Sequence, residues 1–204
     1  ISLNIGGIKG FFKSIHHAAF QVSSIITTTG YATVDFNYWP TFSKVILVIL
    51  MFIGACAGST GGGIKVSRIV ILLKSVRHEI SYLTQKRSVK ILRINGKKIS
   101  NETARSVNLY FVAYMFIFTV SLLIISLDNH DFTTSFTAVA STLNNIGPGL
   151  EAIGPMGNFS NFSNLSKFVM MFDMLAGRLE IFPVLLPISL GISKIKGHKL
   201  TLPR

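Results

Sequence analysis

The chain has 204 residues, of which 49% are hydrophobic and only 14% are charged. Soluble domains carry about 25% charged residues, so this composition excludes an ordinary soluble protein and indicates a membrane protein. The net charge of +12 would also suit nucleic-acid binding, but eleven of the twenty basic residues lie between positions 65 and 105, beside hydrophobic segments. Cytoplasmic loops of membrane proteins show this bias, and we therefore expect membrane lipid, and no nucleic acid, as a partner.

The first half begins with a short apolar segment, residues 11–26, which we expect to form a short helix that ends at a small glycine loop, residues 27–31. An outer connection follows, and then the long segment 41–83. As one helix this segment would be roughly 65 Å long, about twice the hydrocarbon thickness of a bilayer. Five glycines within residues 54–63 mark the expected break, because each costs a helix interior roughly 1 kcal/mol relative to alanine.

The second half contains the clearest membrane span. Residues 109–127 carry no charge and are close to the roughly 20 residues that a spanning helix needs. The basic loop before them places their start on the inner side, and Asn101 with Glu102 is a reasonable helix start. Residues 132–143 are too short to span and predict a re-entrant helix. A second glycine loop follows at 144–149, and residues 165–192 return toward a basic tail.

The two halves repeat one plan. Shifting the sequence by 117 positions aligns Ser24 with Ser141 and Gly30 with Gly147. These are two of three identities in an aligned stretch of thirteen residues. The identity is weak, but the order of short apolar segment, glycine loop and long apolar segment is the same. Internal repeats of this kind are common in transport proteins.

The glycine-rich stretch 54–63 has two other interpretations. It fails the phosphate-loop pattern G-x-x-x-x-G-K-[ST], because Ile64 follows Gly63 and Val66 stands where a hydroxyl residue is required. Glycines spaced four residues apart would also allow close packing of membrane helices. The break in the helix and close packing both remain open.

The first glycine loop reads Thr-Thr-Thr-Gly-Tyr and has the form of the potassium filter sequence T-V-G-Y. In such filters backbone carbonyl oxygens replace the hydration shell of the ion. A glycine is needed because it tolerates positive φ. The second loop keeps only Gly147 in register. Both loops, each after a short apolar helix, predict a cation filter.

Arg178 lies in the apolar segment 165–192. An arginine at a membrane helix centre is costly and should face a cavity or a protein partner. Either Asp173 or Glu180 neutralises it for packing, or it acts as a fixed positive charge beside the conduction path.

These features together resemble the Trk/Ktr/HKT potassium-transporter superfamily, and most closely its Trk-type membrane subunit. The resemblance covers about residues 11–190 and is carried by segments 27–31, 54–65, 145–149 and 177–180. It implies an all-α membrane protein in which repeats of membrane helix, re-entrant pore helix, filter loop and membrane helix surround a central pore. Residues 1–83 would hold a third-repeat-like pore helix, filter loop and broken membrane helix, and residues 105–192 a whole fourth repeat. Residues 84–104 would be a basic cytoplasmic loop and 193–204 a basic cytoplasmic tail.

The resemblance also implies the functional residues. The filter residues would be Thr27, Thr28, Thr29, Gly30, Tyr31, Asn144, Asn145, Ile146, Gly147 and Pro148. Thr28, Thr29, Asn145 and Ile146 would bind potassium through their carbonyls. The implied gate consists of Gly58, Ser59, Thr60, Gly61, Gly62, Gly63 and Arg178.

The expected function is potassium uptake across the inner membrane by the pore-forming subunit, without enzymatic activity and with potassium in place of any organic cofactor. The outer acidic residues that would attract the ion are Asp35, Asp128, Asp131 and Glu151. The expected partners are the missing N-terminal repeats, a TrkA-like cytosolic nucleotide-binding regulatory subunit and a second copy in a homodimer. The alternative is a secondary transporter of sodium or ammonium that uses the broken helix as a midplane site.

Overall fold

The structure, a computed structural model, describes residues 7–54, 56, 59, 61–84, 93–94 and 97–178. The helices are α1 (Gly7–Ile26), α2 (Thr41–Phe52), α3 (Val66–Thr84), α4 (Asn101–Ile125), α5 (Phe132–Leu143) and α6 (Asn164–Arg178), with short 3-10 turns η1 (Phe36–Tyr38), η2 (Ser126–Asp128) and η3 (Glu151–Ile153). Four two-residue strands complete it: β1 (Ile53–Gly54), β2 (Ile64–Lys65), β3 (Arg93–Ile94) and β4 (Lys97–Lys98).

The two short helices lie where the sequence predicts them. Helix α1 ends at Ile26 as expected but begins at Gly7, before the predicted residue 11. Helix α5 has the predicted bounds, and Asp131 caps it by accepting a hydrogen bond from the backbone N–H of Thr133. Each helix therefore leads directly into one of the two glycine loops.

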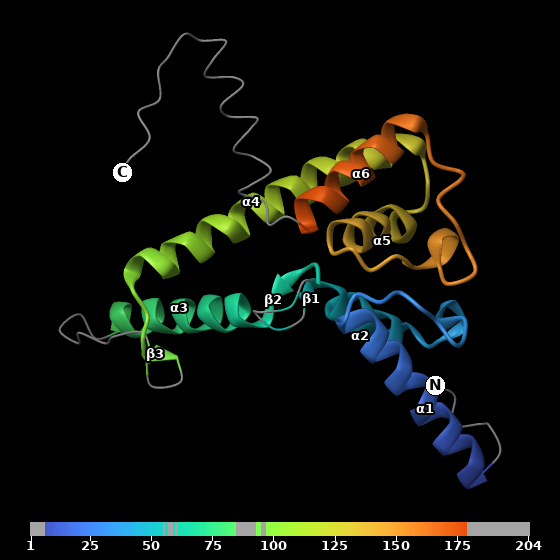
Figure 1. Cartoon of the computed structure of the whole chain (residues 1–204), viewed down its shortest axis with the longest axis horizontal. Helices are drawn as coiled ribbons and strands as arrows, with labels where there is room; N and C mark the ends of the chain where they lie inside the picture. Colours follow the sequence, from blue (N-terminus) through green and yellow to red (C-terminus); the bar gives the residue numbers. More distant parts are fainter. Residues whose placement is uncertain are drawn as a thin grey trace.

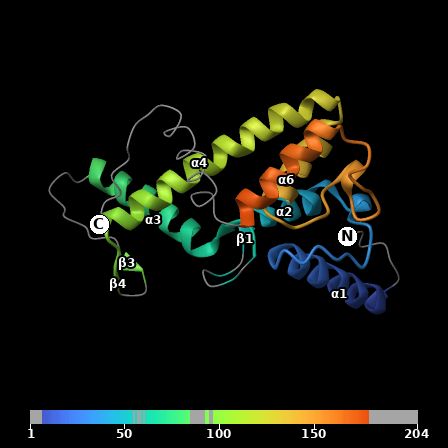
Figure 2. The same cartoon turned by 45° about the horizontal axis from the view of Figure 1, so that its top comes forward.

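The predicted break in the long segment is confirmed. Helix α2 ends at Phe52, and a new helix, α3, starts only at Val66. The two ends of the intervening loop are joined by a short parallel pair, β1 with β2, in which Ile53 is opposite Ile64. The sequence did not predict this pair, which closes the loop at its base. Figures 1 and 2 show α2 and α3 extending to opposite sides of β1.

Helices α4, α5 and α6 pack against one another, and α2 contacts α5; α4 runs beside α6 in Figure 1. Aromatic rings fill the space between these elements: the Phe118 and Phe136 ring centroids are 5.2 Å apart, and those of Phe52 and Phe118 are 5.5 Å apart. Tyr114 on α4 and Val139 on α5 are fully buried. The core thus lies around α5, the short helix that carries the second glycine loop.

One described helix is long and apolar enough to cross a bilayer, over Glu102–Asp128, and it contains the predicted span 109–127. The helix begins at Asn101 as expected, but Ser100 is its cap, accepting from the backbone N–H of Thr103. Its N-terminal turn therefore includes the last residues of the loop expected at 84–104. Large apolar side chains of α4 are exposed, including Val112, Phe116 and Leu123. Such a face suits contact with lipid chains.

Candidate functional site

The first glycine loop is held by backbone hydrogen bonds to the last turn of α1. The N–H of Thr28 donates to the carbonyl of Ile25 at 3.1 Å, and the N–H of Thr29 donates to the carbonyl of Ser24 at 2.9 Å. Thr28 has a φ of 55° and Gly30 a φ of 78°. Both lie in the left-handed region, which glycine adopts freely and threonine does not. The loop is therefore a tight turn that needs external contacts to hold Thr28.

The second loop repeats this geometry at the shift of 117. The N–H of Asn145 donates to Thr142 at 3.1 Å, and the N–H of Ile146 donates to Ser141 at 2.9 Å. Asn145 has a φ of 55° and Gly147 a φ of 115°. Two loops of different sequence therefore share the same backbone hydrogen bonds. The internal repeat predicted from the order of apolar segments extends to the backbone of the loops.

The two loops lie against each other. A side-chain carbon added at Gly30 would collide with the carbonyl oxygen of Ile146 and would meet Pro148 Cδ at 3.3 Å. At Gly147 the nearest atom to such a carbon is the Cα of Gly30, at 4.0 Å. Segments more than one hundred residues apart in the sequence therefore form a single site.

The glycine-rich segment between β1 and β2 borders the same site. A side-chain carbon at Gly62 would collide with the backbone oxygen of Asn144, and one at Gly63 would lie 3.2 Å from Asn144 Oδ1. The Gly61 N–H donates to Ser59 Oγ at 3.0 Å. Gly58 and Thr60, which were also predicted as gate residues, lie outside the described residues.

The end of α6 reaches the second loop from another side. Gly177 packs so closely on the carbonyl oxygen of Leu143 that no side chain fits there, and Asn145 Nδ2 donates to the Met174 carbonyl at 3.0 Å. Arg178, the next residue, is exposed. Arg178 therefore directly follows a residue that contacts the second loop, although some thirty residues separate the two in the sequence.

Asp173 does not neutralise Arg178 among the described residues. Its carboxylate is buried and accepts a hydrogen bond from the Ser121 hydroxyl on α4 at 2.7 Å. Within the part of the chain that the structure describes, Arg178 forms no ion pair. Glu180, the other predicted partner, lies outside the described residues.

Asn144, predicted as a filter residue, has a fully buried side chain that bonds inside the protein. Its Nδ2 donates to the Ala140 carbonyl at 2.7 Å, and its Oδ1 accepts from the Tyr114 hydroxyl at 2.9 Å. Sequence reasoning missed Tyr114, for which no motif gave a signal. It also assigned no role to Ser24 and Ser141, although their alignment at the shift of 117 was visible.

The other predicted filter residues lie on the loops themselves. Thr27 Oγ1 is 2.8 Å from Thr29 Oγ1 and donates to the Ser23 carbonyl at 2.7 Å. The Tyr31 side chain is exposed. Within the described part of the chain, no hydrogen bond is made to the carbonyl oxygens of residues 28, 29, 145 and 146. These four oxygens are the ones predicted to bind the ion.

Each predicted outer carboxylate has a local hydrogen-bond partner. Asp35 accepts from the N–H of Asn37, and Glu151 forms an ion pair with Lys44 at 3.1 Å. Asp128 accepts from the backbone N–H of Ser163 at 2.9 Å. These hydrogen bonds hold the outer connections in place.

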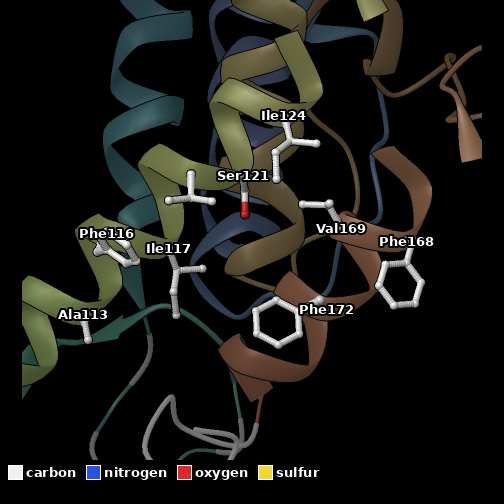
Figure 3. A pocket seen from close by; sticks show the side chains of 9 residues that line it. Ala113, Phe116, Ile117, Ser121, Ile124, Phe168, Val169 and Phe172 are labelled. Carbon is white, nitrogen blue, oxygen red and sulfur yellow. The ribbon is translucent and has the colours of Figure 1, made fainter. Parts of the chain in front are cut away.

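A separate apolar groove of about 380 Å³ lies between α4 and α6 (Figure 3). Its lining residues, almost all apolar, are Ala113, Phe116, Ile117, Val120, Ser121, Ile124, Phe168, Val169 and Phe172. None of the residues that form the two glycine loops lines it. The groove is therefore distinct from the loop site.

Comparison with known proteins gives consistent matches. The sequence profile of a family described as TrkH, cation transport protein, matches residues 11–193. The Trk system potassium uptake protein TrkH of Escherichia coli K12 is 38% identical over 172 residues, which are 84% of this chain and 35% of that protein. TrkG of the same organism is 37% identical over 180 residues, 88% of this chain and 37% of that protein.

Among solved structures, the potassium transporter TrkH from Vibrio parahaemolyticus superposes with a TM-score of 0.76 at 39% identity. The match covers 86% of this chain and 37% of that structure. The chain thus spans little more than a third of the length of the relatives it matches.

Proposed function

Because the chain belongs to the TrkH family of cation transport proteins, we propose that it forms part of a potassium-selective pore for uptake across the bacterial inner membrane. The family membership confirms the resemblance expected from the sequence, and the chain is an all-α membrane protein. The relatives carry the name potassium uptake protein. These names support the proposal that this chain is part of a transporter and not an enzyme.

The observation that carries the proposal is the pair of glycine loops in contact. Both have the same backbone hydrogen bonds, and the carbonyls of Thr28, Thr29, Asn145 and Ile146 accept none from the described residues. Carbonyl oxygens without a protein donor can replace the water around a potassium ion. We therefore assign the ion-binding role to these four oxygens.

The helices before the loops support a cation as the occupant. Helices α1 and α5 each end at a glycine loop. The C-terminal end of a helix carries a partial negative charge of about half an electron. Two such ends beside the loops favour a positive ion and disfavour an anion.

The gate is proposed at the segment 58–63 together with Arg178. Gly62 touches the backbone of Asn144, so a movement of this segment changes the space at the inner side of the filter. A fixed positive charge at Arg178 would raise the barrier for cations at this level. The outer carboxylates would first raise the local cation concentration.

The proposal places the chain as a multi-pass protein of the inner membrane. Residues 1–83 form a third-repeat-like unit and 105–192 a fourth, joined by a cytoplasmic loop at 84–104 and followed by a tail at 193–204. Further N-terminal repeats complete the pore, which fits the coverage of about a third of each relative. The regulatory subunit of TrkA type and the homodimer are part of this proposal, with the basic inner surface as the docking site.

The test is ion flux through the complete protein in proteoliposomes with Gly30→Ser and Gly147→Ser variants. Each change forces a residue with a side chain into the left-handed region, which costs about 1–2 kcal/mol, so rubidium uptake should fall about tenfold. Gly30→Ser should be the more severe because it also collides with Ile146.

Gly10→Ser, in the regular part of α1, is the matched control and should keep wild-type uptake. Fluxes of potassium, rubidium, sodium and ammonium are compared in parallel. If both loop variants transport as the wild type does, or if sodium or ammonium is preferred, the potassium filter is contradicted and the midplane-site transporter is favoured.

A further inference from the structure

Helices α1 and α5 each carry a serine at the third position from the end, Ser24 and Ser141. Both side chains are buried, at 6% and 0% exposure. Most buried hydroxyl groups have a hydrogen-bond partner within the protein. In both helices the partner is the glycine loop that follows.

Each serine holds its loop at two points. The serine carbonyl accepts from the residue before the glycine, Thr29 or Ile146, at 2.9 Å. The Ser24 hydroxyl donates to the Tyr31 carbonyl at 2.6 Å, and the Ser141 hydroxyl donates to the Gly147 carbonyl at 2.7 Å. The acceptors differ by one position in register, but both lie at or just beyond the glycine.

The second loop has one additional bond. The N–H of Gly147 donates to Ser141 Oγ at 3.1 Å, so this hydroxyl accepts and donates at once, as a serine can. Ser141 thus occupies both polar groups of Gly147. The Ser24 hydroxyl holds its loop through a single carbonyl.

These bonds flank one of the two carbonyls that we assign to the ion in each loop, that of Thr29 and that of Ile146. In the first loop the serine binds at Thr29 N–H and at Tyr31 O, on either side of the Thr29 carbonyl. Thr28 and Asn145 both have left-handed backbones, which non-glycine residues adopt only where the surroundings hold them. Within the described residues, the hydroxyls of Ser24 and Ser141 bind the residues that follow this strained turn, Tyr31 and Gly147.

We propose that Ser24 and Ser141 are equivalent positioning residues that set the spacing of the filter carbonyls and thereby the preference for potassium over sodium. This inference rests on the proposed function, since it assigns a role within the same site. A loop released at its far end can close its carbonyls around a smaller ion. Loss of the hydroxyl should therefore change selectivity more than total uptake.

The test uses Ser24→Ala, Ser141→Ala and the double variant in the complete protein, reconstituted in proteoliposomes. Rubidium and sodium uptake are measured for each, and the ratio of the two is the readout. One neutral hydrogen bond lost at each loop should lower the rubidium-to-sodium ratio about fivefold. The double variant should fall further, with rubidium uptake still measurable.

Two serines in the same helices are matched controls. Ser135 on α5 is buried at 2% exposure, and its hydroxyl has no hydrogen-bond partner in the described structure. Ser23 on α1 is exposed. Ser135→Ala and Ser23→Ala remove the same atom without releasing a loop, so their rubidium-to-sodium ratio should equal that of the wild type.

An unchanged ratio in Ser24→Ala and Ser141→Ala, with rubidium uptake still reduced in Gly30→Ser, overturns the positioning role and leaves the proposed filter intact. The same ratio change in the two control variants also overturns it, because it shows a general effect of serine loss. If Ser141→Ala does not fold, as judged by size-exclusion chromatography, the rubidium-to-sodium ratios of Ser24→Ala and Ser141→Cys test the positioning role instead. Absence of rubidium uptake by the wild type would instead contradict the proposed function.

Discussion

Asn144 is the residue whose side-chain packing differs most from its predicted role in the filter. Its backbone lies in the second loop, against Gly62, but its side chain points into the core between Ala140 and Tyr114. A fully buried amide requires partners for both its donor and its acceptor. The side-chain hydrogen bonds in the core thus explain why this residue is an asparagine. Its backbone oxygen lies against Gly62 of the proposed gate.

Replacing Tyr114 by phenylalanine should destabilise the protein. The change keeps the ring but removes the hydroxyl that donates to Asn144 Oδ1, and a buried acceptor left without a donor costs about 1–3 kcal/mol. Thermal unfolding in detergent should give a lower midpoint for this variant. Tyr38→Phe, at a side chain 89% exposed, is the control; equal midpoints for both variants would show that the buried hydroxyl contributes nothing.

At the scale of elements, the two outer connections are tied to each other. Asn37, in η1, donates from Nδ2 to the Glu151 carbonyl at 3.1 Å and accepts from the Glu151 N–H at 2.9 Å. Asn37 also packs against Gly154, where no side chain would fit. This pair of hydrogen bonds joins the segment after the first loop to the segment after the second, and so helps to keep the loops together.

Asn37→Ala and Lys44→Gln separate the two kinds of link to Glu151. The alanine variant loses two neutral hydrogen bonds, together about 1–3 kcal/mol, whereas the partly exposed Lys44 pair contributes about 0–1 kcal/mol. We expect the free energy of unfolding to fall clearly in Asn37→Ala and little in Lys44→Gln. Chemical denaturation of the two purified variants measures this order, and the reverse order would identify the ion pair as the principal link.

At the scale of the whole molecule, the charge distribution and α4 set the orientation. Eleven of the twenty basic residues lie between positions 65 and 105, before α4 and in its first turns, and the carboxylates Asp128 and Asp131 follow the helix. Positive charge is retained on the cytoplasmic side. The outer connections and the N-terminal end of α5 should then face the periplasm.

Cysteine labelling tests this orientation in a cysteine-free background of the complete protein, in which Cys56, the one cysteine of these 204 residues, is replaced by serine. In a Cys56→Ser protein, Asn158→Cys should react with a membrane-impermeant maleimide in intact spheroplasts. Glu102→Cys should react only after permeabilisation, because it lies at the inner end of α4. Both side chains are exposed, so access is decided by the membrane. Labelling of both positions in intact spheroplasts would contradict a spanning α4.

The amino-acid sequence by itself determined the elements: the C-terminal end of α1, both ends of α5, the break after Phe52 and the membrane character of α4. These depend on local properties, since apolar length, glycine content and charge act on neighbouring residues. The tertiary structure alone decided the contact of Gly30 with Ile146, the burial of Asn144 against Tyr114 and the serine bonds to the loops. Those contacts join residues far apart in the chain or depend on a turn geometry that many sequences share, so they exist only once the helices have packed.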